Sequence, residues 1–145
     1  MARYYNKNTY DSVIELKTYE VEALRKEIKK LKTQLSKYME SNKLIAEFMG
    51  YHTYESNGYD MVKYSDCNER TLQDTHYHTS WNWLMPVVEK CLNTEEKTDG
   101  HHYFINDALL TCNIEVVYDR VVEFIKDCEK KSLIDSLDSS EIINK

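Results

Sequence analysis

Apolar residues recur every three or four positions along roughly the first forty residues of the chain. With Leu24 placed at heptad position d, the repeat has β-branched or leucine side chains at a, and mainly leucine or tyrosine at d. The a positions are Ile14, Val21, Ile28 and Leu35, and the d positions are Tyr10, Lys17, Leu24, Leu31 and Tyr38. β-Branched residues at a with leucine at d favour two parallel strands. The pattern therefore predicts a parallel, homodimeric coiled coil.

The charges that flank this repeat agree with a parallel pair. Position g of one helix then faces position e five residues later on the other, which sets Glu20 against Arg25 and Glu27 against Lys32. Each exposed pair contributes only about 0.3–0.5 kcal/mol, so the charges select orientation more than stability. An antiparallel pair or a four-helix arrangement is the main alternative.

The end of this first helix has two interpretations. An unbroken helix would begin after a Thr9 cap, run for about 60 Å and end at Gly50, a residue suited to a left-handed C-terminal position. In the other interpretation the helix breaks at Ser41-Asn42, and Asn42 caps a separate short helix. The capping chemistry of a Ser-Asn pair favours the break.

After Gly50 the pattern changes from helical to alternating. Residues 51–54 and 59–64 alternate aromatic and β-branched residues around the turn Ser56-Asn57-Gly58, which predicts a β-hairpin. Residues 65–79 are polar and irregular, with no predicted element.

An amphipathic helix follows Ser80. Pro86 lies inside its apolar pattern, so either the regular helix starts near Met85 or it is kinked at the proline. A polar loop over 93–100 separates this helix from the rest of the chain.

The last third of the chain predicts two strands and a helix. Residues 102–105 and 109–112 suggest short strands, and Asn113 caps a final helix over 114–130 whose apolar residues share one face. Residues 132–145 are acidic and predict a flexible tail.

These elements predict an α+β chain in three parts. Residues 1–41 form the coiled-coil dimerisation helix, and residues 42–131 form a small α/β sandwich with two or three helices on a short, mostly antiparallel sheet. Residues 132–145 form the tail.

The net charge of −6 is unevenly distributed. Residues 1–41 hold nine Lys/Arg and six Asp/Glu, whereas residues 42–145 hold ten and nineteen, for net charges of +3 and −9. An acidic folded part argues against direct nucleic-acid binding, which relies on a basic surface, but it suits a partner with a basic groove. No apolar run approaches the roughly 20 residues that span a bilayer, so we expect a soluble protein without a membrane partner.

Three segments of the chain resemble the phage ABA sandwich domain, a family of small bacteriophage proteins. They are residues 42–50, residues 77–90 with two tryptophans and the run Leu-Met-Pro-Val-Val-Glu-Lys, and residues 121–126. The resemblance covers about residues 42–131 and implies a layered α/β domain of phage origin. It implies no activity, and the heptad segment and the tail lie outside it.

The sequence contains no catalytic or cofactor motif, and no cofactor is expected. The expected function is a non-enzymatic bacteriophage accessory protein that acts in the host bacterial cytoplasm. As a homodimer it would bind a host protein or protein–nucleic acid complex, such as a CRISPR-type defence component. The alternative is a small-molecule binder that sequesters a nucleotide signal near His76, His78 and Trp83.

The candidate partner-binding residues are Trp81, Trp83, His76 and His78. The two tryptophans are two positions apart and cannot share a helix face, so one would enter the core and the other stay partly exposed, where it could anchor a partner. The favoured interpretation instead packs both beneath residues 65–79.

Simpler roles account better for the residues that could form a zinc site or a nucleophile. His76 and His78 could combine with His101-His102, but structural zinc takes four ligands and no cysteine lies at ligand spacing. The four cysteines are far apart, which predicts free thiols in a reducing compartment. Ser80 lies near His78 but is better explained as a helix cap.

Overall fold

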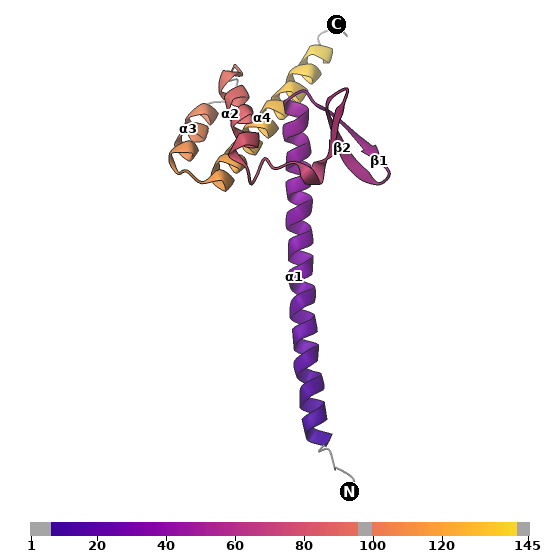
Figure 1. Ribbon diagram of the computed structural model, residues 1–145. Coiled ribbons are helices and arrows are strands. Elements are labelled where there is room, and N and C mark those ends of the chain that lie inside the picture. The colour runs from indigo at the N-terminus through magenta and orange to yellow at the C-terminus, as the bar shows by residue number, and fades with distance from the viewer. Residues whose placement is uncertain (1–6, 96–99, 142–145) are drawn as a thin grey trace. The chain divides into compact units, whose positions relative to one another are not determined.

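The computed structural model describes residues 7–95 and 100–141, and side chains over residues 14–95 and 100–134. Figure 1 shows the elements in chain order, which are α1 (Lys7–Phe48), β1 (His52–Ser56), β2 (Tyr59–Ser65), β3 (Asn68–Thr71), the short helix η1 (Leu72–Asp74), α2 (Trp81–Asn93), α3 (His101–Leu110) and α4 (Ile114–Glu141). The predicted α+β class, with a long N-terminal helix and an antiparallel sheet, is confirmed.

The chain divides into two compact units, unit 1 (Met1–Lys37) and unit 2 (Tyr38–Lys145). The division falls inside α1, four residues before the predicted boundary at 41/42. The helix begins at Lys7, ahead of Thr9, so Thr9 is not its N-cap. Unit 1 is therefore helical over all of its described residues.

The predicted break at Ser41-Asn42 is wrong, because α1 continues to Phe48. Both residues are buried. The Asn42 amide is used in tertiary contacts, since its Nδ2 donates to the carbonyl of Thr75 at 3.4 Å and its Oδ1 accepts from the Tyr118 hydroxyl at 2.9 Å. An amide engaged in this way cannot cap a helix.

Gly50 follows the end of α1, as predicted. It has φ +87°, a left-handed conformation in which glycine meets no steric penalty. Its N–H donates to the carbonyl of Glu47, and the N–H of Tyr51 donates to the carbonyl of Ala46, both at 2.9 Å. These paired bonds form a Schellman motif, which turns the chain into the sheet.

The predicted hairpin is confirmed by the antiparallel pairing of β1 and β2. Its loop consists of Asn57 (φ 53°) and Gly58 (φ 78°), and two positive φ values identify the type I′ turn that suits strand twist. A third strand, β3, pairs antiparallel with β2 and was not predicted. Its four residues, NERT, carry no apolar alternation that would have marked it.

Helix α2 begins at Trp81, directly after Ser80, so the predicted start near Met85 is wrong. Pro86 lies in the interior of the helix on an exposed position. The carbonyl of Ser80 accepts the N–H of Leu84 at 3.0 Å, and Leu84 is fully buried. Packing of this first turn offsets the free energy lost because Pro86 has no backbone N–H to donate within the helix. Ser80 occupies the N-cap position without a side-chain hydrogen bond.

The strands predicted over 102–105 and 109–112 are wrong, because helix α3 covers the whole first segment and half of the second, whose last two residues form a turn. Ile105 and Ala108 are buried and lie three positions apart, whereas Phe104, the residue before Ile105, is exposed. That spacing is helical, and burial on one face outweighs the β-propensity of the aromatic and branched residues.

Asn113 caps α4 as predicted, with its Oδ1 accepting the N–H of Glu115 at 3.0 Å. The helix does not end at residue 130 but continues to Glu141. Residues 132–141 of the predicted tail are therefore helical, and residues 142–145 lie outside the described residues.

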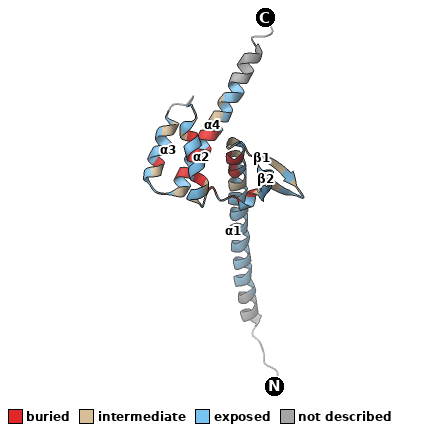
Figure 2. Ribbon diagram, turned by 45° about the horizontal axis from the view of Figure 1, so that its top comes forward, coloured by how far each residue is buried: buried red, intermediate tan, exposed pale blue. Residues whose placement is uncertain are grey.

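Two clusters of buried apolar side chains organise unit 2. The larger cluster combines Ile45 of α1 with residues of α2, α3 and α4, and the smaller one combines Ala46 with Val62 of β2 and Leu72. Figure 2 shows the buried residues gathered on α2, α4 and the end of α1. Because neighbouring residues on a helix point about 100° apart, the last turns of α1 contribute to both clusters.

Candidate functional site

The predicted dimerisation residues of unit 1 form an exposed apolar stripe. Each of the six is between 45 and 59 % exposed: Ile14, Val21, Leu24, Ile28, Leu31 and Leu35. A long helix draws most of its stability from burying an apolar face, and no described residue covers this one. The stripe is therefore a candidate interaction surface.

Tyr38, the last predicted dimerisation residue, has different surroundings. It belongs to unit 2, is partly buried, and stacks on His78 with ring centroids 4.6 Å apart. Its ring also lies 6.0 Å from that of Tyr118. The apolar stripe of unit 1 therefore ends at Leu35.

His78 is held as a neutral side chain beneath Tyr38. Its Nδ1 is buried and has no hydrogen-bond partner among the described residues. Burial is the main cause that lowers the pKa of His78, and the charge of His76 lowers it further, while Glu115 acts in the opposite direction. The lowered pKa favours the neutral ring near pH 7, and this ring stacks on Tyr38.

We expect unit 2 to lose stability as the pH falls below the ordinary histidine pKa of 6.5. The unfolded chain binds a proton at His78 more readily than the folded chain does, so acid favours unfolding. A His78→Phe variant keeps a ring on Tyr38 but cannot be protonated. Urea denaturation at pH 7.5, 6.0 and 5.0 should show a smaller loss of unfolding free energy in the variant, and an equal loss in both proteins would contradict the assignment.

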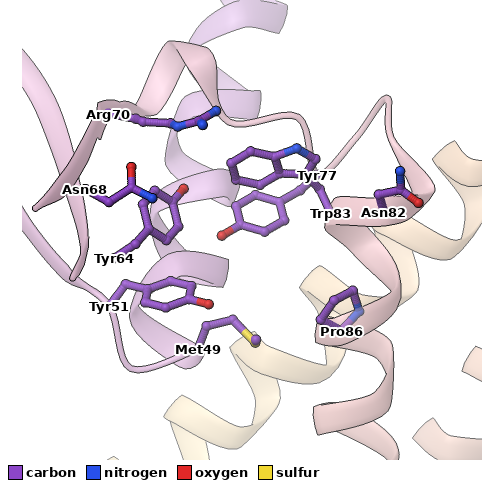
Figure 3. A pocket seen from close by; sticks show the side chains of 9 residues that line it. All are labelled: Met49, Tyr51, Tyr64, Asn68, Arg70, Tyr77, Asn82, Trp83 and Pro86. Atoms are coloured by element: carbon purple, nitrogen blue, oxygen red, sulfur yellow. The ribbon is translucent and has the colours of Figure 1, made fainter.

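Unit 2 also contains an aromatic pocket, shown in Figure 3. Its volume is about 320 Å³. The residues that line it come from the end of α1, the sheet, the segment before α2, and α2 itself: Met49, Tyr51, Tyr64, Asn68, Arg70, Tyr77, Asn82, Trp83 and Pro86.

The rings of this pocket pack edge to face around Trp83. The centroid of the Tyr77 ring lies 5.4 Å from that of Trp83, with 89° between the ring planes. For Tyr64 and Trp83 the centroid distance is 5.9 Å and the angle is 74°. Tyr51 meets Tyr64 at 4.6 Å and 63°. The guanidinium of Arg70 lies over the Trp83 ring with its Cζ 5.6 Å from the centroid, a cation–π contact.

The hydroxyl groups of Tyr64 and Tyr77 are buried and lack hydrogen-bond partners within the described part of the chain. Tyr77 is the more enclosed, with only 2 % of its surface exposed. Burial raises the pKa of both phenols, so both remain protonated. The two hydroxyls lie close together, and a hydrogen-bonding interaction between them lowers the pKa of Tyr64 and raises that of Tyr77, although the pair falls short of full hydrogen-bond geometry.

No family model, curated protein or solved structure matches this chain. The resemblance of residues 42–131 to the phage ABA sandwich domain thus stays a prediction, and function has to be argued from geometry. None of the described helices is both long enough and apolar enough to cross a membrane.

The structure brings together only part of the predicted partner-binding set. Trp83 lines the pocket. The His76 ring lies edge-on to the Trp83 ring, with the centroids 6.1 Å apart and an angle of 87° between the ring planes. Trp81 is 37 % exposed and Trp83 is partly buried against the helical cluster, which fits the less favoured of the two interpretations, one tryptophan packed and the other partly exposed. The interpretation that both tryptophans pack beneath residues 65–79 is wrong. His78 lies with Tyr38 and not among the residues that line the pocket.

Sequence reasoning missed the residues that complete the pocket: Tyr51, Tyr64, Asn68, Arg70 and Tyr77. A signal was present in the hairpin, where tyrosines alternate along the strands, but it was used only to place those strands. Arg70 ends up beside Trp83 because β3 pairs with β2, and β3 was not predicted.

His101 and His102 each contact another group of the protein. His101 Nε2 lies 3.1 Å from Asp127 Oδ2, and His102 Nε2 lies 2.9 Å from the carbonyl of Cys91. None of the four cysteines is in a disulfide, as predicted, and burial raises the pKa of Cys91 to about 12, which makes it unreactive. Among residues 7–95 and 100–141, no three His, Cys, Asp or Glu side chains are grouped to hold a metal.

Proposed function

We propose that this protein is a non-enzymatic binding protein that works as a homodimer, with a parallel coiled coil in unit 1 joining two copies of unit 2. The observation that carries the proposal is the exposure of all six apolar a and d side chains between Ile14 and Leu35. Exposed apolar surface of this extent marks an interaction site. A second copy of the same helix offers the complementary seam, because its own stripe has the same spacing.

The flanking charges support a second copy as the occupant. Glu20 and Glu27 at g positions would face Arg25 and Lys32 at e positions of a parallel partner. All four side chains are exposed and free to form these pairs across the seam. An unrelated partner helix would need the same charge pattern to match as well.

The target of such a dimer is a host macromolecule with a basic surface. Residues 42–145 carry a net charge of −9, which favours encounter with a basic groove. Trp81 supplies an exposed aromatic side chain of the kind that anchors interfaces. On a dimeric or repetitive target, two linked copies bind more tightly than one copy, by a factor on the order of 10²–10⁴, as other bivalent binders do.

The finer proposal is a bacteriophage accessory protein that inhibits a host defence system in the bacterial cytoplasm. It is supported only by the resemblance of residues 42–131 to a phage domain. Sequestration of a small ligand is a second candidate function, which the aromatic pocket with its unpartnered hydroxyls favours.

Capture of a host protein from bacterial lysate tests the proposal. The baits are the wild type, a Leu24→Asp, Leu31→Asp variant that cannot pair, and an Ala23→Asp, Thr33→Asp variant with the same charge change on the outer face of the helix. We expect the wild type and the outer-face variant to retain the same protein at moderate salt, and the unpaired variant to retain at least tenfold less. Equal retention by all three baits, or retention by none, would contradict a dimeric binder.

A further inference from the structure

We propose that the aromatic pocket of unit 2 is a binding site for a mononucleotide, whose base stacks among the pocket's rings and whose phosphate pairs with Arg70. This site is separate from the helical stripe and does not depend on dimerisation. It rests on three features of the pocket: unpartnered donors, an unpaired cation and a set of aromatic walls.

The unpartnered donors are the hydroxyls of Tyr64 and Tyr77. Buried polar groups in native proteins nearly always have a hydrogen-bond partner, and these two hydroxyls interact only weakly with each other, so a ligand with acceptor atoms at this wall would complete their bonding. Figure 3 shows both hydroxyls, with that of Tyr51, turned toward the hollow of the pocket.

The unpaired cation is Arg70. No described carboxylate pairs with it, and none lines the pocket, although residues 42–145 are strongly acidic overall. Its charge acts on the hydroxyl of Tyr64, where it lowers the pKa against the larger effect of burial. A guanidinium beside phenol donors matches the oxygens of a phosphate, which it can bind in a bidentate manner.

The aromatic walls and the rim suit a base. Tyrosine and tryptophan rings stack on nucleobases regardless of base identity. Asn68 and Asn82 are exposed at the rim, and each amide offers a donor and an acceptor to a base edge. The volume of about 320 Å³ lies at the lower end of small-ligand sites, which favours one nucleotide over a dinucleotide.

Simpler ligands would leave part of the site unused. An apolar ligand would bury the two hydroxyls and Arg70 without partners, which is unfavourable. A bare anion would leave the rings without a stacking partner. A nucleotide satisfies both requirements, because it joins a planar ring to a phosphate.

The test is a titration of the full-length protein with AMP, GMP, CMP and UMP, monitored by calorimetry. The melting temperature of the protein with each nucleotide is a second measurement. At least one should bind saturably and raise the melting temperature, because the ligand binds only the native state. Inorganic phosphate and the nucleoside of the tightest-binding nucleotide, tested alone, should each bind at least tenfold more weakly than that nucleotide. The absence of saturable binding by all four nucleotides at 1 mM would overturn the proposal, as would a nucleoside that binds as tightly as its nucleotide.

Two variants locate the site. Tyr77→Phe keeps the ring and removes an orphan hydroxyl, so the free protein should stay as stable as the wild type while affinity falls about tenfold, the effect of losing one hydrogen bond. Arg70→Gln should reduce affinity at least tenfold. Arg120→Gln is the matched control, because Arg120 makes the same kind of contact over Phe104 at 5.6 Å but lies outside the pocket. Affinity unchanged in both pocket variants would overturn the assignment.

The Leu24→Asp, Leu31→Asp variant separates this inference from the proposed dimer. Its substitutions lie in unit 1, so it should bind the nucleotide with wild-type affinity. The two sites are independent if the Leu24→Asp, Leu31→Asp variant loses dimerisation but keeps nucleotide binding. The same conclusion follows if Arg70→Gln loses nucleotide binding but keeps dimerisation. Weakened nucleotide binding in the unpaired variant would overturn the claim that the pocket works without the dimer.

Discussion

The double substitution Leu24→Asp, Leu31→Asp should convert the protein into a monomer in which unit 2 remains folded. Both leucines occupy d positions, so a pair of such helices would have to bury four carboxylates in its seam. Removing a charge from water without a partner costs several kcal/mol, so we expect dimer affinity to fall more than a hundredfold. Light scattering and sedimentation should report the 17.3 kDa mass of one chain.

The outer-face variant Ala23→Asp, Thr33→Asp controls for charge and helix propensity. Ala23 and Thr33 lie at heptad positions c and f, are exposed, and gain the same two negative charges. This variant should remain dimeric. Both tryptophans of the chain lie in unit 2, so an unchanged fluorescence spectrum shows that unit 2 is intact. A Leu24→Asp, Leu31→Asp protein that still scatters as a dimer would contradict the heptad argument.

Elements with strong local signals were predicted correctly. The heptad pattern marks α1 over many turns, and the Asn57-Gly58 pair specifies a type I′ turn through its positive φ values. Gly50 and Asn113 act through bonds to residues a few positions away. In each case the deciding contact lies within one element or its boundary, so the sequence contains the information in a short window.

The errors arose where distant contacts decide. Asn42 has good capping chemistry, but Tyr118 and Thr75 bind its amide and keep it inside α1. In α3 the aromatic residues favour a strand, yet burial of Ile105 and Ala108 against other helices selects the helix. Periodicity alone cannot separate these outcomes in a segment of ten residues.

The pocket could be predicted only in part for the same reason. Trp83 stood out as a tryptophan, but its neighbours Tyr64 and Arg70 reach it through the pairing of β2 with β3. The two orphan hydroxyls have no sequence signature, because an unpartnered group is defined by what surrounds it. Tyrosine content indicates that such pockets can form, and only the fold shows which rings meet.

Phe124→Ala should destabilise unit 2 by about 3–5 kcal/mol, the range for truncating a buried phenylalanine. Phe124 is 0 % exposed and packs against three other rings of the helical cluster. The Phe48 ring meets it edge-on at 6.2 Å, His102 stacks on it at 5.8 Å, and His101 lies edge-on at 5.9 Å. The alanine leaves a cavity bounded by the last residue of α1 and the first turn of α3, so neither element can relax into it alone.

Urea denaturation followed by tryptophan fluorescence measures this effect in unit 2 alone, because unit 1 contains no tryptophan. With a slope of about 1–3 kcal/mol per molar urea, the midpoint should fall by roughly 2 M. Phe104→Ala is the matched truncation, and since Phe104 is 46 % exposed it should cost about 1 kcal/mol. Similar midpoints for the two variants would mean that the helical cluster does not hold unit 2 together. If Phe124→Ala lowers the midpoint several times more than Phe104→Ala, the end of α1 is part of the core of unit 2, as the burial of Ile45 indicates.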